Sequence, residues 1–338
     1  MVSAMDIQNN GNNGRRWLKP VSAVLALVLV VLLVLGWYWS REPDVPAVDT
    51  LVEEFAGGRT VKGVRTTAAL MGAVDVLLSK PGGFLTNDIL PPGLWLDNMP
   101  HWEYGVLIQV RDLSKAMRDR FSRSQSQSTE DRDLALADPR FNFDNDSWAL
   151  PASESEYREG LEYLDSYMSR LIDEDQYNAQ FYTRADNLRF WLSTVESRLG
   201  SLSQRLSASV GQRRLNTDLA GESAAGQATS APDEVIVKTP WNEIDDVFYE
   251  ARGTTWALVL FLRAMEKDFA EVLEKKNAKV SLQQIVRELE ATQTPLYSPV
   301  VLNGTGFGLL ANHSLAMASY ISRANAAIID LRTLLAEG

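Results

Sequence analysis

The chain has 338 residues, no cysteine and a formal net charge of −11 at pH 7. The lack of cysteine excludes disulfides, thiolate nucleophiles, zinc ribbons and a lipid anchor on cysteine. Residues 1–40 carry a net charge of +2 and the remainder carries −13, a charge that repels phosphate backbones, so we expect no nucleic-acid partner.

The first feature along the chain is a candidate membrane helix. Residues 1–17 are polar and rich in Asn and Gly, which predicts a short disordered cytoplasmic tail. Residues 18–39 are apolar and numerous enough to cross a bilayer as a helix. Because Arg15, Arg16 and Lys19 lie on its N-terminal side, the positive-inside bias puts the N-terminus in the cytoplasm. We therefore predict a signal-anchor in the inner (cytoplasmic) membrane and a periplasmic C-terminal domain.

A cleaved signal peptide is the alternative to a retained anchor. The segment Val45-Pro46-Ala47 offers a weak small-residue cleavage site. However, the apolar run exceeds the roughly 7 to 15 residues of a signal-peptide core, and Trp37, Tyr38 and Trp39 precede that site. Such aromatic rings favour the headgroup level of a membrane. We therefore prefer the retained anchor, with the bilayer itself as a partner through residues 18–39.

Apolar residues at spacings of three and four predict helices in the part that follows. The first two are expected at 60–80 and 103–123. A mobile connection is expected at 122–139, where large apolar side chains are few. Ser153 and Glu156 form a capping box that predicts the start of another helix, carried by an apolar heptad.

The strongest periodic signal is a series of apolar residues that steps alternately by four and three. Its members are Phe181, Ala185, Leu188, Leu192, Val195, Leu199, Leu202 and Leu206. The series predicts a helix over 177–210, about 50 Å long, that packs on other long helices as a bundle or coiled coil. We expect residues 40–210 to form a first helical part that resembles a long rod more than a compact globule.

The C-terminal third is predicted to be helical as well. Residues 211–238 contain a Gly-, Ala- and Ser-rich stretch without periodicity, which indicates a flexible linker. Residues 239–338 form a second helical part that packs on the first. Thr239, followed by proline, is expected to cap a helix whose apolar centre lies inside the bundle. Shorter helices are expected at 281–291 and 312–336. The predicted fold class is all-α: a single N-terminal transmembrane helix and an extended helical bundle with long coiled-coil-like helices.

Two long connections, at 84–104 and 294–312, interrupt the helical pattern with proline, glycine and aromatic residues. Connections of this length are uncommon in compact proteins and are often functional. We expect an interaction surface at four aromatic residues within them: Trp95, Trp102, Tyr297 and Phe307. The alternative is that the apolar residues of both connections only cover the ends of the bundle.

Two segments carry a resemblance to a known family. Residues 89–107 read ILPPGLWLDNMPHWEYGVL and residues 184–192 read RADNLRFWL. Together with the aromatic-flanked anchor, they resemble a bacterial family of membrane-anchored proteins catalogued as domain of unknown function 2333. The resemblance covers most of the part after the anchor. It implies a Gram-negative cell envelope, and it supplies no activity, cofactor or catalytic residue.

The sequence shows no pattern typical of a catalytic, cofactor or metal site. His101 and His313 lie in irregular connections without a nucleophile elbow, so structural roles are favoured for both. The leading hypothesis is a non-enzymatic envelope protein, a periplasmic helical scaffold or interaction module that docks a protein partner. A homodimer through the heptad surface is compatible with it. The alternatives are an extracytoplasmic sensor or ligand-binding bundle and, less favoured, an envelope hydrolase that uses one of the histidines.

Overall fold

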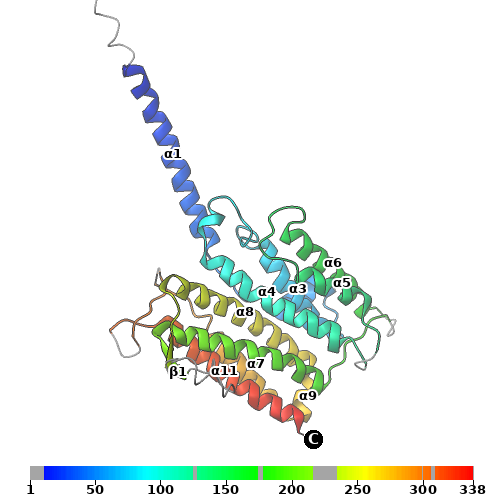
Figure 1. Cartoon of the computed structure of the whole chain (residues 1–338). Coiled ribbons are helices and arrows are strands. Elements are labelled where there is room, and N and C mark those ends of the chain that lie inside the picture. Colours follow the sequence, from blue (N-terminus) through cyan, green and yellow to red (C-terminus); the bar gives the residue numbers. More distant parts are fainter. Residues whose placement is uncertain are drawn as a thin grey trace, which may run out of the picture.

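The computed structural model describes residues 11–124, 128–173, 178–215, 234–298, 300–305 and 309–337, without the side chains of residues 11–18 and 214–215. In Figure 1 one long helix, α1 (Gly11–Trp39), stands clear of a helical body. Its segment Lys19–Trp39 has a mean hydropathy of 2.7, and only 6% of the residues in its most apolar window are buried. At about 1.5 Å per residue this segment matches the roughly 30 Å of a bilayer's hydrocarbon core. Within the described ranges it is the one helix with the length and composition to cross a membrane.

The body is built of helices, which confirms the all-α prediction. Its α-helices are α2 (Val48–Ala56), α3 (Val64–Ser79), α4 (Asn98–Ala116), α5 (Arg132–Phe141), α6 (Ser153–Leu171), α7 (Ala185–Ser207), α8 (Ile244–Asp268), α9 (Ala270–Lys275), α10 (Lys279–Ala291) and α11 (His313–Ala336). The two central helices α4 and α8 pack side by side, with α3, α5 and α6 on one side and α7 and α11 on the other (Figure 1). Single 3₁₀ turns are η1 (Gly93–Trp95), η3 (Ala208–Val210) and η5 (Trp241–Glu243). The segment η2 (Met117–Phe121) is π-helical and continues α4.

The centre of the core is the contact between α4 and α8. The predicted burial of the apolar middle of α8 is confirmed, since its residues from Ala251 to Leu262 are all buried. Gly105 of α4 and Gly253 of α8 allow the two backbones to touch. A β-carbon at Gly105 would overlap the carbonyl oxygen of Glu250, and one at Gly253 would overlap that of Trp102. The two glycines therefore set how closely these helices approach.

The prediction of a mobile connection over 122–139 is wrong for the second part of this segment, because α5 begins at Arg132. The Asp131 carboxylate caps this helix by accepting hydrogen bonds from the backbone N–H groups of Asp133 and Leu134, at 3.0 and 3.2 Å. Leu134 and Phe141 are fully buried. A short helix with so few apolar residues gives little periodic signal, and tertiary packing stabilises it.

The helix predicted to start at Ser153 is confirmed, but the capping box is wrong. Ser153 is the first helical residue, and its hydroxyl donates to the carbonyl oxygens of Asp144 and Ser147, at 2.7 and 3.1 Å. Glu156 pairs with Arg140 of α5 instead of reaching back along its own helix. Both side chains therefore fasten the α5–α6 loop.

The rod-like helix predicted over 177–210 is shorter than expected, because α7 spans only 23 residues. Before it the chain is irregular, and the Tyr182 N–H donates to the Phe121 carbonyl oxygen at 2.6 Å. Phe181 continues the apolar series in sequence but packs over Gly63. The heptad leucines of α7 are buried against helices of the same chain, so this surface is already occupied. A coiled-coil geometry stays a prediction.

The ends of the segment predicted to be a flexible linker are strands. β1 (Gln212–Leu215) pairs antiparallel with β2 (Glu234–Val237), Gln212 opposite Val237. The Gly-, Ala- and Ser-rich stretch itself lies within residues 216–233, outside the described residues. Thr239 does not cap a helix; its hydroxyl donates to the Arg205 carbonyl oxygen, and α8 begins only at Ile244. The two sequence halves pack as one body, since α8 lies between α4 and α7.

Candidate functional site

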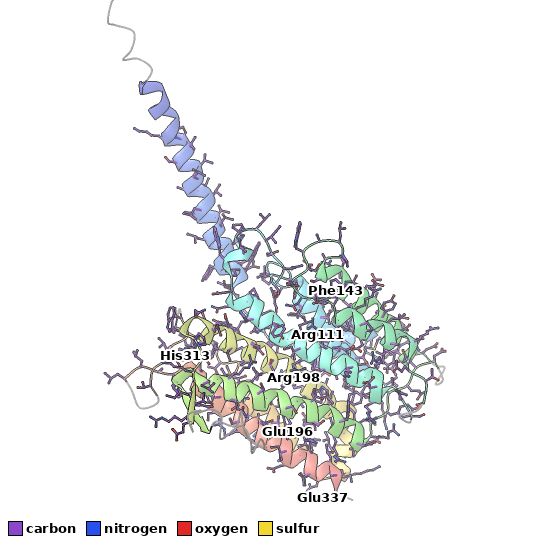
Figure 2. The ribbon with its side chains drawn as sticks, viewed as in Figure 1. Arg111, Phe143, Glu196, Arg198, His313 and Glu337 are labelled. Carbon is purple, nitrogen blue, oxygen red and sulfur yellow. The ribbon has the colours of Figure 1, made fainter. Side chains whose placement is uncertain are left out.

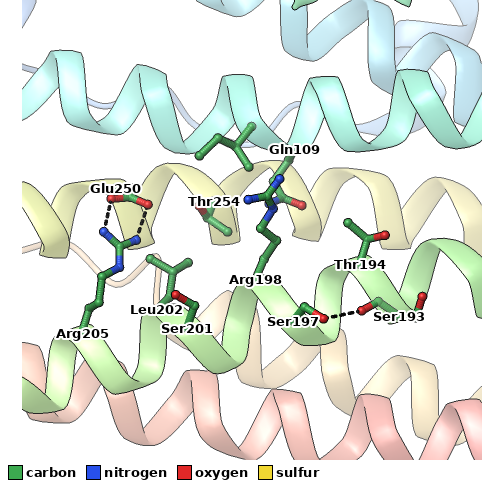
Figure 3. A pocket seen from close by; sticks show the side chains of 11 residues that line it. Gln109, Ser193, Thr194, Ser197, Arg198, Ser201, Leu202, Arg205, Glu250 and Thr254 are labelled. Carbon is green, nitrogen blue, oxygen red and sulfur yellow. Dashed lines mark hydrogen bonds and ion pairs between the residues drawn. The ribbon is translucent and has the colours of Figure 1, made fainter. Parts of the chain in front are cut away.

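A polar groove of about 380 Å³ lies between α4, α7 and α8. Figure 3 shows it from close by, with α7 supplying most of its hydroxyl groups. Ser193, Ser197 and Ser201 follow one another at intervals of four residues, which places them on one face of α7. That face is opposite the buried leucines of the same helix. Gln109 of α4 and Thr254 of α8 complete the lining.

Both arginines of the groove are already paired with carboxylates. Arg198 donates to both oxygens of Asp112, at 2.9 and 3.1 Å. Arg205 holds Glu250 in a two-pronged contact, with one hydrogen bond of 2.8 Å (Figure 3). The hydrogen bonds to Asp112 and Glu250 raise the pKa of Arg198 and of Arg205, respectively. The lining is thus charge-balanced, which favours a neutral or zwitterionic ligand over a free anion.

Gln109 is the unusual residue of the groove. Its side chain is 0% exposed, and in the described part of the chain neither its amide oxygen nor its amide nitrogen has a hydrogen-bond partner. Leaving a buried polar group unpaired costs about 1–3 kcal/mol. Water or a ligand with one donor and one acceptor would satisfy the amide. Because the amide has no exposed surface, a ligand in the groove would reach it only after a neighbouring side chain moves.

In the part of the chain that the structure describes, the one carboxylate that lines the groove, Glu250, is already held by Arg205. The serine and threonine hydroxyls of the groove need a neighbouring base to become nucleophiles, and the groove's lining includes neither histidine nor lysine. The hydroxyl of Ser197 donates to the backbone oxygen of Ser193 at 3.1 Å. The arrangement can bind through hydrogen bonds.

The two histidines lie elsewhere and hold structural bonds. His101 Nε2 lies 3.1 Å from an Asp246 carboxylate oxygen and so links α4 to α8. His313 Nδ1 accepts a hydrogen bond from the Leu302 N–H at 3.0 Å. Burial lowers the pKa of His313, which suits an imidazole that must stay neutral to accept. These contacts favour the structural roles expected for both histidines.

Of the four aromatic residues expected to form an interaction surface, Trp95 and Tyr297 are exposed, by 51% and 93%. Trp102 is wrongly placed in that set, because it is 0% exposed. Helix α4 begins at Asn98, so Trp102 lies in its first turns and packs edge-on against Trp256, with ring centroids 5.3 Å apart. Phe307 lies outside the described residues.

The exposed aromatic residues occupy separate places. Trp95 lies in η1, which contacts α1. Tyr297 lines a different cavity, of about 410 Å³, together with Phe248, His313 and Tyr320. Sequence reasoning missed the groove, although the four-residue spacing of Ser193, Ser197 and Ser201 was a readable sign of a small polar face. Nothing in the sequence pointed to a role for Gln109, since a lone glutamine on a helix is usually exposed to solvent.

Comparison with known proteins identifies the family of the chain but assigns no activity to it. The chain matches the family described as an uncharacterised protein conserved in bacteria, domain of unknown function 2333, over residues 11–338. Comparison with curated proteins and with solved structures finds no match. The match runs from α1 to the last helix and includes residues 89–107 and 184–192, which carry the resemblance in the sequence. The chain therefore belongs to the bacterial family of domain of unknown function 2333.

Proposed function

We propose that the protein is held in the inner membrane by α1 and that its helical body serves, outside the cytoplasm, as a non-enzymatic interaction module. The observation that carries this proposal is the exposure of an apolar helix on all its faces. Only 6% of the residues in the most apolar window of Lys19–Trp39 are buried, although the mean hydropathy of this segment is 2.7. A core helix buries such side chains, and each costs about 1.5–3 kcal/mol if left in water. A lipid environment would cover the exposed apolar faces of α1.

The junction between α1 and the body supports a retained anchor over a cleaved signal peptide. Trp39 packs directly over Gly82. Glu42 forms an ion pair with Arg252 at 2.7 Å, and the Pro43 carbonyl oxygen accepts a hydrogen bond from Trp256 Nε1 at 2.8 Å. Cleavage after Ala47 would remove all three contacts from the core. The fold thus uses residues that a signal peptidase would discard.

Carbonate extraction of membranes and a C-terminal phosphatase fusion test the anchor. We expect the full chain in the membrane pellet and an active phosphatase outside the cytoplasm. Charges at the centre of a spanning helix cost roughly 2.5–3.5 kcal/mol each, so Val28→Arg with Leu29→Arg should move the chain to the supernatant. Val280→Arg, at an exposed position of α10, is the control that should stay in the pellet. A soluble mature chain that begins near Val48 would contradict the proposal.

Crosslinking in intact cells tests the interaction role. The exposed Tyr297 is the first residue to change, because its side chain is 93% exposed. We expect Tyr297→Ala to weaken capture of a protein partner while the melting temperature stays unchanged. Val280→Ala is the matched exposed control. Equal capture by both variants and the parent chain would argue against this surface.

A ligand-binding role is the second candidate, and Gln109 favours it. In a groove that stays dry, Gln109→Leu removes an unpaired amide and should stabilise the protein by about 1–3 kcal/mol. In a groove that holds a hydrogen-bonded ligand, the same change should abolish ligand-dependent thermal stabilisation. Chemical denaturation and thermal shift assays with polar amide-containing compounds separate the two cases. Thr194→Val, which keeps the shape of the lining, is the control.

A further inference from the structure

Six large apolar side chains lie open to solvent on the side of the body from which α1 rises. They are Ile89, Leu90, Leu94, Trp95, Trp148 and Leu150, and their exposures range from 51% for Trp95 to 100% for Leu150. They belong to two loops, 80–97 and 142–152, which both lie at this edge in Figure 1. We call these six residues the apolar rim. Gathered apolar side chains of this kind mark a protein or membrane contact.

The two loops of the apolar rim are joined to each other. The Asn87 amide donates to the Ser147 carbonyl oxygen at 2.8 Å and to Glu154 Oε2 at 2.7 Å. Ile89, Leu90 and Trp148 line one shared cavity of about 160 Å³. The rim is therefore one continuous feature, although its parts are some 60 residues apart in sequence.

Helix α4 fixes both loops in place. Arg111 donates to the carbonyl oxygens of Phe141 and Phe143, at 2.7 and 2.8 Å, and Figure 2 labels Arg111 and Phe143 close together. Glu103, buried in the body, accepts hydrogen bonds from the N–H groups of Leu85 and Thr86, at 2.9 and 2.8 Å. These bonds hold one end of each loop against α4.

The rim loop touches α1 within the apolar segment itself. Gly36 is buried, and a β-carbon there would lie 3.5 Å from Pro92 Cβ and 3.8 Å from Leu96 Cδ2. Gly36 precedes Trp39, the end of the apolar segment, by three residues, or about 4.5 Å along the helix axis. A loop that packs against α1 at this level reaches the depth at which a spanning helix enters lipid.

We infer that the apolar rim inserts into the headgroup region of the same membrane that α1 crosses, on the leaflet that faces the body. The inference rests on the proposed function, because it needs α1 in the bilayer. Tryptophan favours the membrane interface, and aliphatic side chains beside it add apolar contact with the acyl chains. The flanking side chains Asp88 and Glu154 are acidic, so attraction to anionic lipids is not the cause. The rim should insert into a neutral phosphatidylcholine bilayer.

Single cysteines in the full-length chain test this inference, because the chain has none of its own. Leu90→Cys and Trp148→Cys carry an environment-sensitive fluorophore after reconstitution into phosphatidylcholine vesicles that contain nitroxide-labelled lipid. We expect at least two-fold stronger quenching at both rim sites than at Val280→Cys. Val280 is 75% exposed in α10, which follows α9 on the side of the body remote from α1 (Figure 1). All three positions are on the surface, so labelling should spare the fold.

A fourth label, Val28→Cys in the middle of α1, separates the two proposals. Quenching at Val28 without quenching at Leu90 and Trp148 would overturn the rim and leave the anchor intact. No quenching at Val28 would overturn the anchor, and the rim with it. Rim labels that lipid leaves unquenched but that are shielded from aqueous iodide in cells would assign the rim to a protein partner and overturn the membrane assignment.

Discussion

At the scale of single residues, buried charged side chains fasten loops to helices. Lys80 and Glu103 pair at 2.6 Å with side chains that are almost fully buried, and Glu103 also accepts the N–H groups of Leu85 and Thr86. Burial raises the pKa of Glu103, and the positive charge of Lys80 opposes that rise. Such a pair stabilises only while both partners remain. The main effect of the Lys80–Glu103 pair is therefore to fix the position of the loop before α4.

The His313 contact predicts a pH dependence at the same scale. Burial lowers the pKa of His313 below its ordinary value of 6.5, so protons bind the unfolded chain more tightly. This contribution to the free energy of unfolding is complete above pH 6.5 and is lost as the pH falls through the lowered pKa. An NMR titration of the imidazole, assigned by loss of the signal in His313→Gln, should give a midpoint below 6.5. A midpoint at or above 6.5 would refute it.

At the scale of elements, sequence periodicity predicted the helices that have long apolar faces and missed those that do not. The start of α11 after Asn312 is confirmed, because the Asn312 side chain accepts the Leu315 N–H at 2.8 Å. α2 was missed: its nine residues gave too little periodic signal. α7 was predicted too long because Phe181 keeps the apolar spacing while the chain there is irregular. Spacing alone cannot separate a helical apolar residue from a loop residue packed on the core.

The candidate site was harder to predict than the helices. The groove draws Gln109, Arg205 and Glu250 from three helices, and nothing in the sequence states that α4 and α7 flank α8. For Trp102 the sequence contained the necessary signal, but the residue was assigned to a loop because it lies near a proline. Its spacing to Val106 and Val110 places it on the buried face of α4, and this pattern was readable.

The crossing of α4 and α8 gives a prediction at the scale of elements. Gly253→Ala should lower the free energy of unfolding by about 1–3 kcal/mol or more, because the new methyl group meets the Trp102 backbone. Gly200→Ala in α7 is the matched control: its methyl group would meet only the Asn325 amide, at 3.6 Å. That change should stabilise by up to about 1 kcal/mol through helix propensity. Urea denaturation that ranks the two variants as equal would count against the close crossing.

At the scale of the whole molecule, the joint between α1 and the body is short and built from core contacts. Arg252 pairs with Glu42 and also donates to the carbonyl oxygens of Thr292 and Thr294, both at 3.0 Å. One guanidinium thus ties the segment after α1 to α8 and to the loop that leads to Tyr297. The orientation of the body therefore follows the orientation of α1.

Loss of Glu42 tests that joint. Glu42→Ala leaves the Arg252 side chain, 7% exposed, without its carboxylate, and should lower the free energy of unfolding by about 1.5–3 kcal/mol. Asp49→Ala removes the solvent-exposed pair with Lys267 and should change stability very little. Chemical denaturation of the full chain in detergent measures the free energy of unfolding of both variants. An equal, small effect of both changes would mean that the joint is held by packing alone.

The short joint also limits where a binding partner can be. A flexible linker between α1 and the body would let the body move through a wide volume and contact molecules far from the lipid. The joint is not flexible in this way, because contacts with the body hold Trp39, Glu42 and Pro43 in place. If α1 spans the bilayer as proposed, a binding partner must approach the body at a fixed height above the membrane. The two proteins would then meet by diffusion along the membrane surface, and the density of the anchored protein would set the rate.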